Sequence, residues 1–230
     1  MDRSQPVTFE LERDLANIRS LNRWFGSYRQ VQYFLACWLK PNDKARILDV
    51  ATGSGDIPRL IVDFARRYDV SVSIDAIDQQ SSTIEIARRL SKDYPEIEFF
   101  CANLFEWNPV ANPKLDCLKQ SDFSQPYDIV FCSLALHHFS DDDAIRVLLK
   151  CRELSREHVL VADLRRSRWL SFGVYLLTAA IYRNAMTKAD ARLSAARAFS
   201  FNEMHKLGER AGWENFGHRK FPIGRQAIWL

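Results

Sequence analysis

The sequence predicts an α/β fold, a doubly wound and mostly parallel sheet of seven strands with helices before it and a helical insert after the fifth strand. Two observations carry this prediction. Short apolar segments alternate along the chain with segments whose apolar residues recur at helical spacing. Strand-like runs such as Ile129–Phe131 are continuously apolar, which is typical of strands that helices cover on both faces. At 230 residues the chain is long enough to bury a full core.

Two amphipathic segments come before the first expected strand. Apolar residues recur at helical spacing from Leu11 to Phe25 and again from Val31 to Trp38. The sequence Lys-Pro-Asn-Asp at residues 40–43 then ends the second segment. We therefore expect residues 1–43 to form an N-terminal helical cap.

Residues 44–164 are expected to form the core of the sheet. Pro58 suits the first turn of the helix after the first strand, and Ser140 suits the N-cap of the helix after the fourth strand. Residues 106–126 contain three prolines and are expected to be a surface excursion. The expected strands are Ala45–Val50, Val70–Ile77, Glu96–Ala102, Tyr127–Leu134 and His158–Asp163, and the expected helices are Ile57–Tyr68, Ser82–Asp93 and 140–154.

The alternation of strands and helices stops after the fifth strand. Residues 165–200 are expected to be a helical insert on the substrate side, with an apolar stretch from Trp169 to Tyr182. Residues 201–211 resemble a last long helix, stopped by Gly212. Residues 213–221 and 226–230 then suit a closing antiparallel hairpin. We expect residues 1–230 to form one domain.

Composition and charge narrow the class of protein. The hydrophobic fraction of 47% and charged fraction of 27% are those of a soluble globular protein. A net charge of +3 is too small to indicate nucleic-acid binding, so we expect no nucleic-acid partner. The 5 cysteines show no Cys-x-x-Cys spacing, which favours free thiols in a reducing compartment. A polar N-terminus and the lack of a long apolar stretch predict a cytoplasmic protein with no integral membrane segment. No pattern indicates an oligomeric state.

The segment Ile47–Asp56 is the most informative part of the chain. An apolar run ends in an acidic residue, Asp49, and a turn with two of the chain's 8 glycines follows. Gly53 and Gly55 let the backbone approach a ligand where a Cβ atom would clash. The next helix presents its N-terminal amides to the same space. This turn therefore predicts a ligand site at the end of the first strand.

Polar residues also follow the next two strands. Asp78 ends the second strand and can accept hydrogen bonds from both hydroxyls of a ribose. Asn103 follows the third strand, and its side-chain amide can pair with the edge of an adenine. Because ligands of doubly wound sheets bind at the carboxyl ends of the strands, we expect an adenosyl ligand there.

These residues resemble the motifs of the class I S-adenosylmethionine-dependent methyltransferases, whose first motif wraps the amino-acid end of S-adenosylmethionine. The resemblance covers roughly Ile47 to Leu164 and implies the Rossmann-like fold of that family. Two positions depart from the family pattern, since Asn103 stands where an acidic residue is common and Ala51 where glycine is frequent. The N-terminal helices of related enzymes often cover the cofactor. The resemblance therefore implies a cofactor site made of Asp49, Ala51, Thr52, Gly53, Gly55, Asp78, Gln79, Asn103, Leu104 and Ser133, with Tyr28 or Arg29 reaching the methionine carboxylate.

A dinucleotide cofactor is the main alternative for this turn. Residues 53–58 read Gly-Ser-Gly-Asp-Ile-Pro and lack the third glycine of the dinucleotide fingerprint. Asp56 would also bring a carboxylate close to a pyrophosphate, whereas the zwitterionic end of S-adenosylmethionine tolerates it better. S-adenosylmethionine is therefore favoured, and an ordinary strand-to-helix turn without a ligand is the remaining alternative.

The residues after the fourth strand bear on the methyl acceptor. Residues 133–136 read Ser-Leu-Ala-Leu and lack the acidic or Asn residue and the two prolines of base- and amide-N-methylating members of the fold. The Leu-His-His-Phe sequence at Leu136–Phe139 is similar to the small-molecule branch, which includes ubiquinone and menaquinone biosynthesis enzymes and polyketide-tailoring enzymes. The resemblance implies O-methylation or C-methylation of an aromatic, quinone-like or polyketide-derived compound in secondary metabolism. A non-catalytic S-adenosylmethionine-binding protein of the same fold is the alternative.

Five further residues are candidates for contact with the acceptor. His137 and His138 follow the fourth strand and can serve as the base that a phenol or enol acceptor needs, although a structural pair is also possible. Arg192, Arg197 and Tyr175 lie in the insert and can bind the acceptor, the arginines through a carboxylate or phenolate. The alternatives for the insert are solvated or ion-paired arginines and ordinary core packing. The acidic run at residues 141–143 complements the dipole of a helix start, so we expect no metal site.

Overall fold

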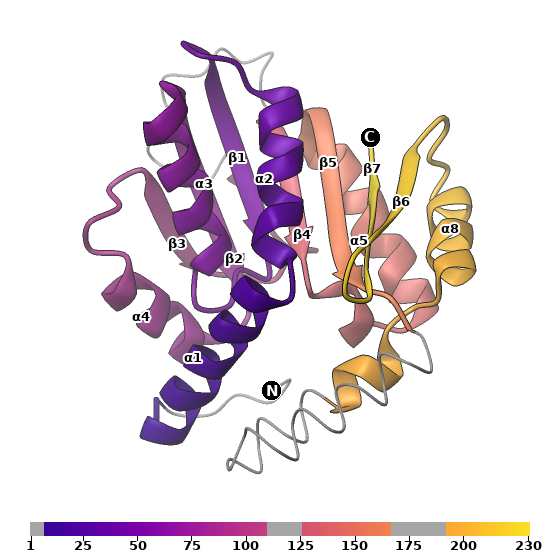
Figure 1. Ribbon diagram of the computed structural model, residues 1–230, viewed down its shortest axis with the longest axis horizontal. Helices are drawn as coiled ribbons and strands as arrows, with labels where there is room; N and C mark the ends of the chain where they lie inside the picture. Colours follow the sequence, from indigo (N-terminus) through magenta and orange to yellow (C-terminus); the bar gives the residue numbers. More distant parts are fainter. Residues whose placement is uncertain (1–6, 110–125, 167–191) are drawn as a thin grey trace.

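The central element of the computed structural model, which describes residues 7–109, 126–166 and 192–230, is a twisted sheet (Figure 1). Within these ranges the sheet has seven strands in the order β3-β2-β1-β4-β5-β7-β6. Strands β1 to β5 pair in parallel, while β7 runs antiparallel to both β5 and β6. This confirms the predicted doubly wound sheet. The strands are β1 (Lys44–Val50), β2 (Ser71–Asp78), β3 (Ile97–Cys101), β4 (Tyr127–Ser133), β5 (Ser155–Leu164), β6 (Gly217–Phe221) and β7 (Arg225–Trp229).

Helices cover both faces of the sheet, with α2 and α3 on one face and α5 and α8 on the other (Figure 1). Side chains that alternate along β1 show this division, since Ile47 packs with α2 and α3 while Leu48 packs with α5. Both cores are therefore apolar. The helices are α1 (Phe9–Trp24), α2 (Ser27–Trp38), α3 (Asp56–Tyr68), α4 (Ser81–Leu90), α5 (Asp141–Leu154) and α8 (Phe201–Arg210), and η4 (Leu136–His138) is a single 3-10 turn.

The expected elements lie within a few residues of the observed ones. The helix expected to reach Asp93 ends at Leu90, because the amide of Ser91 bonds to Arg88 O, three residues back, and the chain turns there. Strand β5 begins at Ser155, three residues before the expected start, because the chain pairs with Tyr127 as soon as α5 ends. The closing hairpin is confirmed as β6 and β7.

The N-terminal helices lie over the sheet and along its carboxyl edge. Helix α2 packs its apolar face into the core beside α3, while α1 contacts α4 through Leu11, Leu15 and Ile86. An exposed ion pair, with Arg89 Nη2 2.6 Å from Glu12 Oε1, also joins α1 to α4. In Figure 1, α1 lies near the edge toward which the arrowheads of the parallel strands point. The N-terminal segment therefore reaches the edge where the ligand site was predicted.

The described parts of the insert are its two ends. Residues 165–166 leave β5, and residues 192–197 are helical and lead to α8. The apolar stretch from Trp169 to Tyr182, with Tyr175 in it, lies outside the described residues. No helix in the described part of the chain is long and apolar enough to cross a membrane.

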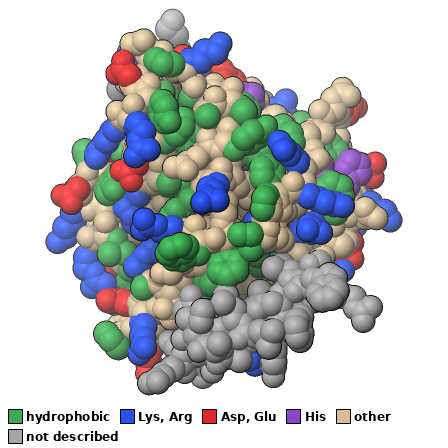
Figure 2. Space-filling view, in the orientation of Figure 1, with side chains coloured by type: hydrophobic (Ala, Val, Ile, Leu, Met, Phe, Trp, Pro, Cys, Tyr) green, Lys and Arg blue, Asp and Glu red, His purple; other side chains and the backbone are tan. Residues whose placement is uncertain are grey.

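The surface carries charges of both signs. Figure 2 shows Lys and Arg side chains spread between hydrophobic and acidic ones on the face that carries α2 and α3. The described residues on this face do not gather into the basic stripe that nucleic-acid binding requires. The four described cysteines, at positions 37, 101, 132 and 151, are free thiols.

Candidate active site

The turn between β1 and α3 is built from residues in left-handed conformations. Ala51, Gly53 and Gly55 have φ angles of 55°, 55° and 73°. The amide of Thr52 donates to Ile77 O at 3.0 Å, which fastens the turn to β2. Ala51 adopts a conformation that costs an alanine about 1 kcal/mol, which is why glycine suits that position.

The two glycines of the turn serve different purposes. A Cβ atom on Gly53 would meet no heavy atom within 4 Å, so this residue borders open space. A Cβ atom on Gly55 would lie 2.8 Å from the ring of Phe99, so this residue lets the turn pack against β3. Gly53 therefore leaves room for a ligand, whereas Gly55 serves the packing of the fold.

Asp78 holds the turn from the end of β2. Its Oδ2 accepts a hydrogen bond from Gly53 N at 2.9 Å, and its Oδ1 accepts one from Gln80 N at 2.9 Å. Burial raises the pKa of Asp78, although these amide bonds oppose the shift. Each carboxylate oxygen can accept a further hydrogen bond. The neighbouring Gln79 is exposed. The arrangement suits a ribose, but that role stays a prediction.

Asp49 is a buried carboxyl group that has no cationic partner in the described part of the chain. Its side chain is 1% exposed, and no hydrogen bond of normal geometry reaches either oxygen. Burial raises the pKa of Asp49 to about 8, against the influence of nearby Thr52, and Asp56 and Asp78 raise it further. The hydroxyls of Thr52 and Ser133 are likewise buried without a partner among the described residues. Such groups cost about 1–3 kcal/mol each, so the cluster suits a polar, cationic ligand.

Asp56 ties the N-terminal helices to the turn. Its Oδ2 accepts hydrogen bonds from Asn22 Nδ2 and from Tyr28 Oη, both at 3.1 Å. Burial raises the pKa of Tyr28 above its ordinary value, and the Asp56 charge adds to the shift. The Tyr28 hydroxyl is thus used within the protein, and Arg29 is exposed. Their contact with a methionine carboxylate stays a prediction.

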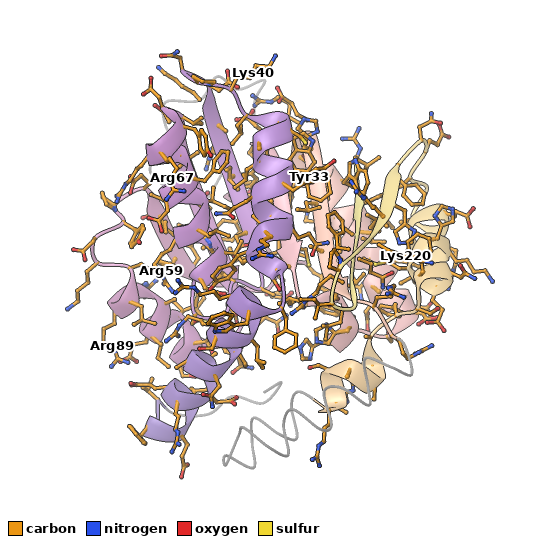
Figure 3. The ribbon with its side chains drawn as sticks, viewed as in Figure 1. Tyr33, Lys40, Arg59, Arg67, Arg89 and Lys220 are labelled. Carbon is orange, nitrogen blue, oxygen red and sulfur yellow. The ribbon has the colours of Figure 1, made fainter. Side chains whose placement is uncertain are left out.

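Two arginines lie beside the turn. Arg59, labelled in Figure 3, donates to Ser54 O at 2.9 Å and to Ser91 Oγ at 2.8 Å. Arg19 of α1 has a buried Nη1 atom that makes no hydrogen bond within the described ranges. Arg19 is a candidate ligand for a carboxylate that sequence reasoning missed, because one basic residue on an amphipathic helix gives no local signal.

The residues after β3 form a turn of their own. Asn103 Oδ1 accepts a hydrogen bond from Phe105 N at 3.0 Å, and Asn103 Nδ2 donates to Glu106 Oε1 at 3.4 Å. Leu104 is 6% exposed and packs with Val50 in the core. The structure therefore shows the Asn103 amide shaping its own loop. Its contact with an adenine stays a prediction.

A buried histidine–aspartate pair lies at the carboxyl ends of β4 and β5. His137 Nδ1 is 2.6 Å from Asp163 Oδ1, and the backbone amide of His137 donates to Asp163 Oδ2 at 2.9 Å. Their side chains are 4% and 2% exposed. Burial raises the pKa of Asp163, but the charge of His137 and the bonds from His137 and Leu164 outweigh burial and hold that pKa below its ordinary value.

The two histidines share one cavity of about 370 Å³. The ring of His138 lies 4.3 Å from that of His137, measured between centroids. Arg197 also lines the cavity, whereas Arg192 is exposed and does not line it. The structure thus brings together three of the five residues predicted to contact the acceptor. The lining residues are His137, His138, Phe139, Ser140, Asp141, Arg166, Arg197, Phe199 and Glu203.

Arg225 of β7 is a second buried cation near this edge. It is 4% exposed, its Nε donates to Phe25 O at 3.2 Å, and its Nη1 has no hydrogen-bond partner in the described ranges. Burial lowers the pKa of Arg225 to about 10, and the charge of Asp163 partly offsets that shift. Sequence reasoning missed Arg225 because it lies in a hairpin far along the chain from Asp163.

No metal centre is formed by the side chains described. Among residues 7–109, 126–166 and 192–230, no group of three or more His, Cys, Asp or Glu residues could hold a metal ion. The acidic residues 141–143 occupy the first turn of α5, where Ser140 Oγ accepts a hydrogen bond from Asp143 N at 3.2 Å.

Residues 47–158 match a protein family described as a methyltransferase domain. This range contains the glycine turn, Asp78, Asn103 and both cavity histidines. No curated protein sequence matches the chain at a significant level. The domain match therefore covers just under half of the chain, the part that carries most of the predicted cofactor site.

Solved structures of methyltransferases share this fold. A SAM-dependent methyltransferase from Aquifex aeolicus is 13% identical, with a TM-score of 0.62 over 96% of this chain and 98% of that one. The plantazolicin methyltransferase BpumL, in complex with a monoazolic desmethylPZN analog and SAH, is 12% identical, with a TM-score of 0.63 over 96% and 88%. Human N-acetylserotonin methyltransferase, in complex with SAM, is 13% identical, with a TM-score of 0.62 over 96% of this chain but only 55% of the human one. At these identities the likeness shows a common fold.

Proposed function

Starting from the class I S-adenosylmethionine-dependent methyltransferase that the domain match and the fold indicate, we propose that the protein methylates a hydroxyl group, or an activated carbon, of a small organic molecule. The acceptor is aromatic, quinone-like or polyketide-derived. The bound SAM and SAH of the structural neighbours support S-adenosylmethionine as the methyl donor here.

The unsatisfied polar cluster at the ends of β1 and β4 is the observation that carries this proposal. Asp49, Thr52 and Ser133 supply buried oxygen atoms that lack partners in the described part of the chain, next to the open space at Gly53. These oxygens fit the ammonium group at the amino-acid end of S-adenosylmethionine, and Asp78 fits its ribose. When bound, the cofactor supplies a methyl group already activated on a sulfonium. The protein therefore has only to orient the acceptor and exclude water.

The cavity at the end of β4 supports a small acceptor. Its volume of about 370 Å³ is within the range of small-molecule sites. His137 and His138 can accept the proton of an acceptor hydroxyl, and Arg197 can bind an anionic group on the same molecule. Neighbours named for N-acetylserotonin and plantazolicin methylation support this class of substrate.

Calorimetry with S-adenosylmethionine and S-adenosylhomocysteine tests the donor site. We expect wild-type protein to bind both compounds and Asp49→Asn to weaken binding, because Asn cannot become the carboxylate that a bound cation favours. Glu85→Ala, which changes an exposed acid on α4, is the matched control and should bind like wild type. A folded wild-type protein that bound neither compound would refute the proposal.

Transfer of a labelled methyl group tests catalysis. We expect label from S-adenosylmethionine to enter low-molecular-weight phenols, quinols or enols, and Asp49→Asn to reduce the incorporation. Binding of the donor without transfer to any small molecule would point instead to a non-catalytic binding protein of the same fold.

A further inference from the structure

The junction between α1 and α2 lies against the start of β7. Arg225 Nε donates to Phe25 O at 3.2 Å, and Gln30 Nε2 donates to Gln226 O at 3.0 Å. Gln30 and Arg225 are 3% and 4% exposed, so both of the donating side chains are buried. The start of α2 is therefore held beside the guanidinium of Arg225, although Phe25 and Arg225 are 200 residues apart in the sequence.

Two side-chain groups at this junction can donate hydrogen bonds but lack acceptors in the described part of the chain. Nη1 of Arg225 and Oγ of Ser27 are buried without a partner there. Helix α2, of 12 residues, begins beside them, and its N-cap residue, Gly26, has no side chain to accept from the first amides. A guanidinium, a hydroxyl and the positive end of an uncapped helix are thus close together.

Gly26 leaves room for a ligand beside these donors. Its φ of 85° is left-handed, and a Cβ atom on it would meet no heavy atom within 4 Å. The start of α2 therefore borders open space. Because buried polar groups in folded proteins are nearly always paired, two unpaired groups next to open space indicate a ligand that accepts hydrogen bonds.

We propose that this junction binds a carboxylate of the methyl acceptor, with Arg225 and Ser27 as its main ligands. This inference rests on the proposed methyltransferase function and adds a requirement for the acceptor, namely a single negative charge. Arg225 is then the residue that distinguishes an acidic acceptor from a neutral one of the same shape.

The charges around the junction favour an anion with one charge. Arg225 is buried there, and Asp163 interacts with it electrostatically. Asp56 accepts a hydrogen bond from Tyr28 Oη, in the first turn of α2, at 3.1 Å. A dianion such as a phosphate monoester would meet the field of both carboxylates with one buried cation to balance it. A carboxylate carries a single charge, and its two oxygens can accept from a guanidinium and a hydroxyl.

The position of Arg225 in the sheet separates this junction from the donor side. Strand β7 is the third strand from β1 in the order β1-β4-β5-β7. Neighbouring strands are about 4.8 Å apart, so Arg225 lies about 14 Å across the sheet from the glycine turn. Arg225 pairs in register with Leu164, next to Asp163, which contacts the cavity residue His137. An anion bound here therefore belongs to the acceptor and not to the methionine end of the donor.

Arg225 and the cavity residue Arg197 differ in exposure. Arg197 is exposed, whereas Arg225 is 4% exposed. An electrostatic interaction is stronger where water is excluded, since the local dielectric constant is lower. Arg225 should therefore discriminate between a carboxylate and a neutral group more sharply than Arg197 does.

The first test is calorimetry on protein saturated with S-adenosylhomocysteine, with benzoate, benzamide and phenyl phosphate as probes. We expect wild type to bind benzoate at least about 10-fold more tightly than neutral benzamide, because hydrogen bonds to charged groups are the stronger ones. Arg225→Met should remove this preference. Arg219→Met, which changes an exposed arginine of the same hairpin, is the matched control and should keep it. Equal binding of benzoate and benzamide by wild type, or tighter binding of phenyl phosphate than of benzoate, would overturn the proposal.

The second test is kinetic and uses labelled S-adenosylmethionine with 4-hydroxybenzoate, 3-hydroxybenzoate and 4-methylphenol. We expect Arg225→Met to raise KM for the preferred hydroxybenzoate by about 10-fold or more while kcat changes little. The KM for 4-methylphenol should not change. Ser27→Ala should raise the hydroxybenzoate KM by about threefold, and Arg225→Lys should restore part of the loss. If wild type methylates neither hydroxybenzoate in preference to 4-methylphenol, the inference is wrong.

Stability measurements separate a binding role from a structural one. Arg225→Met removes a buried charge and one hydrogen bond to Phe25, so denaturant unfolding should show a stability close to that of wild type. Benzoate should raise the thermal midpoint of wild type but not that of Arg225→Met. If Arg225→Met does not fold, Ser27→Ala decides the question, because it should weaken benzoate binding and leave benzamide binding unchanged.

Donor binding distinguishes failure of this inference from failure of the proposed function. S-adenosylmethionine should bind to wild type and to every variant of Arg225 and Ser27. A folded wild-type protein without donor binding would count against the function itself. Donor binding without benzoate binding would refute the carboxylate site alone.

Discussion

The two halves of the candidate site are built in different ways. On the donor side, at the ends of β1 and β2, the ligand space is shaped by backbone, with three left-handed residues in one turn and amides fixed by Asp78. On the acceptor side, at the ends of β4 and β5, the space is shaped by side chains, with His137 held by Asp163 and arginines nearby. A backbone site suits one constant ligand, whereas a site of side chains can change its acceptor through single substitutions.

Among the substitutions that test the difference between the donor side and the acceptor side, we expect Asp78→Ala to have the largest effect. The substitution leaves the amides of Gly53 and Gln80 without their acceptor and removes the proposed ribose contact. Because hydrogen bonds to charged groups contribute about 1.5–3 kcal/mol each, we expect S-adenosylmethionine affinity to fall by about 100-fold or more. Calorimetry measures this loss, and Glu85→Ala is the control. An unchanged affinity would show that the turn holds the donor without Asp78.

The second-largest expected effect is the pH dependence that Asp49 gives to folding stability and to donor binding. In the free protein its pKa of about 8 exceeds the ordinary 3.8, so the folded state binds a proton that the unfolded state releases above about pH 4. The contribution of Asp49 to stability is therefore present at low pH and is lost as pH rises from about 4 through about 8. A bound cation favours the carboxylate, so donor binding near pH 7 should release protons and tighten as pH rises.

Thermal unfolding across pH and calorimetry in buffers of different ionisation enthalpy measure these two effects. Asp49→Asn should remove the contribution of Asp49 to the pH dependence and should abolish proton release. Proton release that persists in Asp49→Asn would assign the titration to another group.

Two glycine variants on the donor side test separately the space for a ligand and the packing of the turn. Gly53→Ala should weaken donor binding while costing only about 1 kcal/mol of stability, because its Cβ enters open space but keeps a left-handed φ. Gly55→Ala should cost about 2–4 kcal/mol, since its Cβ also meets the ring of Phe99 at 2.8 Å. Denaturant unfolding and calorimetry check the pair. Equal losses of stability would contradict the division between the two glycines.

The smallest expected effect is that of Tyr28→Phe. It removes one hydrogen bond to Asp56 and leaves the one from Asn22, so we expect a stability loss of about 1 kcal/mol. Donor affinity should change less than twofold if the Tyr28 hydroxyl serves only Asp56. A tenfold loss of affinity with little loss of stability would support the contact with the methionine carboxylate that the sequence predicts.

The difference between the backbone-built donor side and the side-chain-built acceptor side also explains which features can be predicted from the sequence. The strands, the helices and the glycine turn are predictable because their signals are local, as in the apolar run that ends at Asp49. The partner of His137 is not predictable from the sequence. Asp163 lies 26 residues further along the chain and meets His137 only through the parallel pairing of β4 and β5. Asn103 shows a third case, because an Asn side chain can serve a ligand or its own loop, and the sequence does not distinguish these uses.

The position of Asp56 has a consequence for how the protein opens. One carboxylate, on the first residue of α3, receives both the end of α1 and the start of α2. Helix α1 also contacts α4 through a small apolar cluster and an exposed ion pair. We therefore expect detachment of α1 to loosen the glycine turn as well. Amide protons in both segments should exchange with solvent at a common rate, slowed together when the donor is bound.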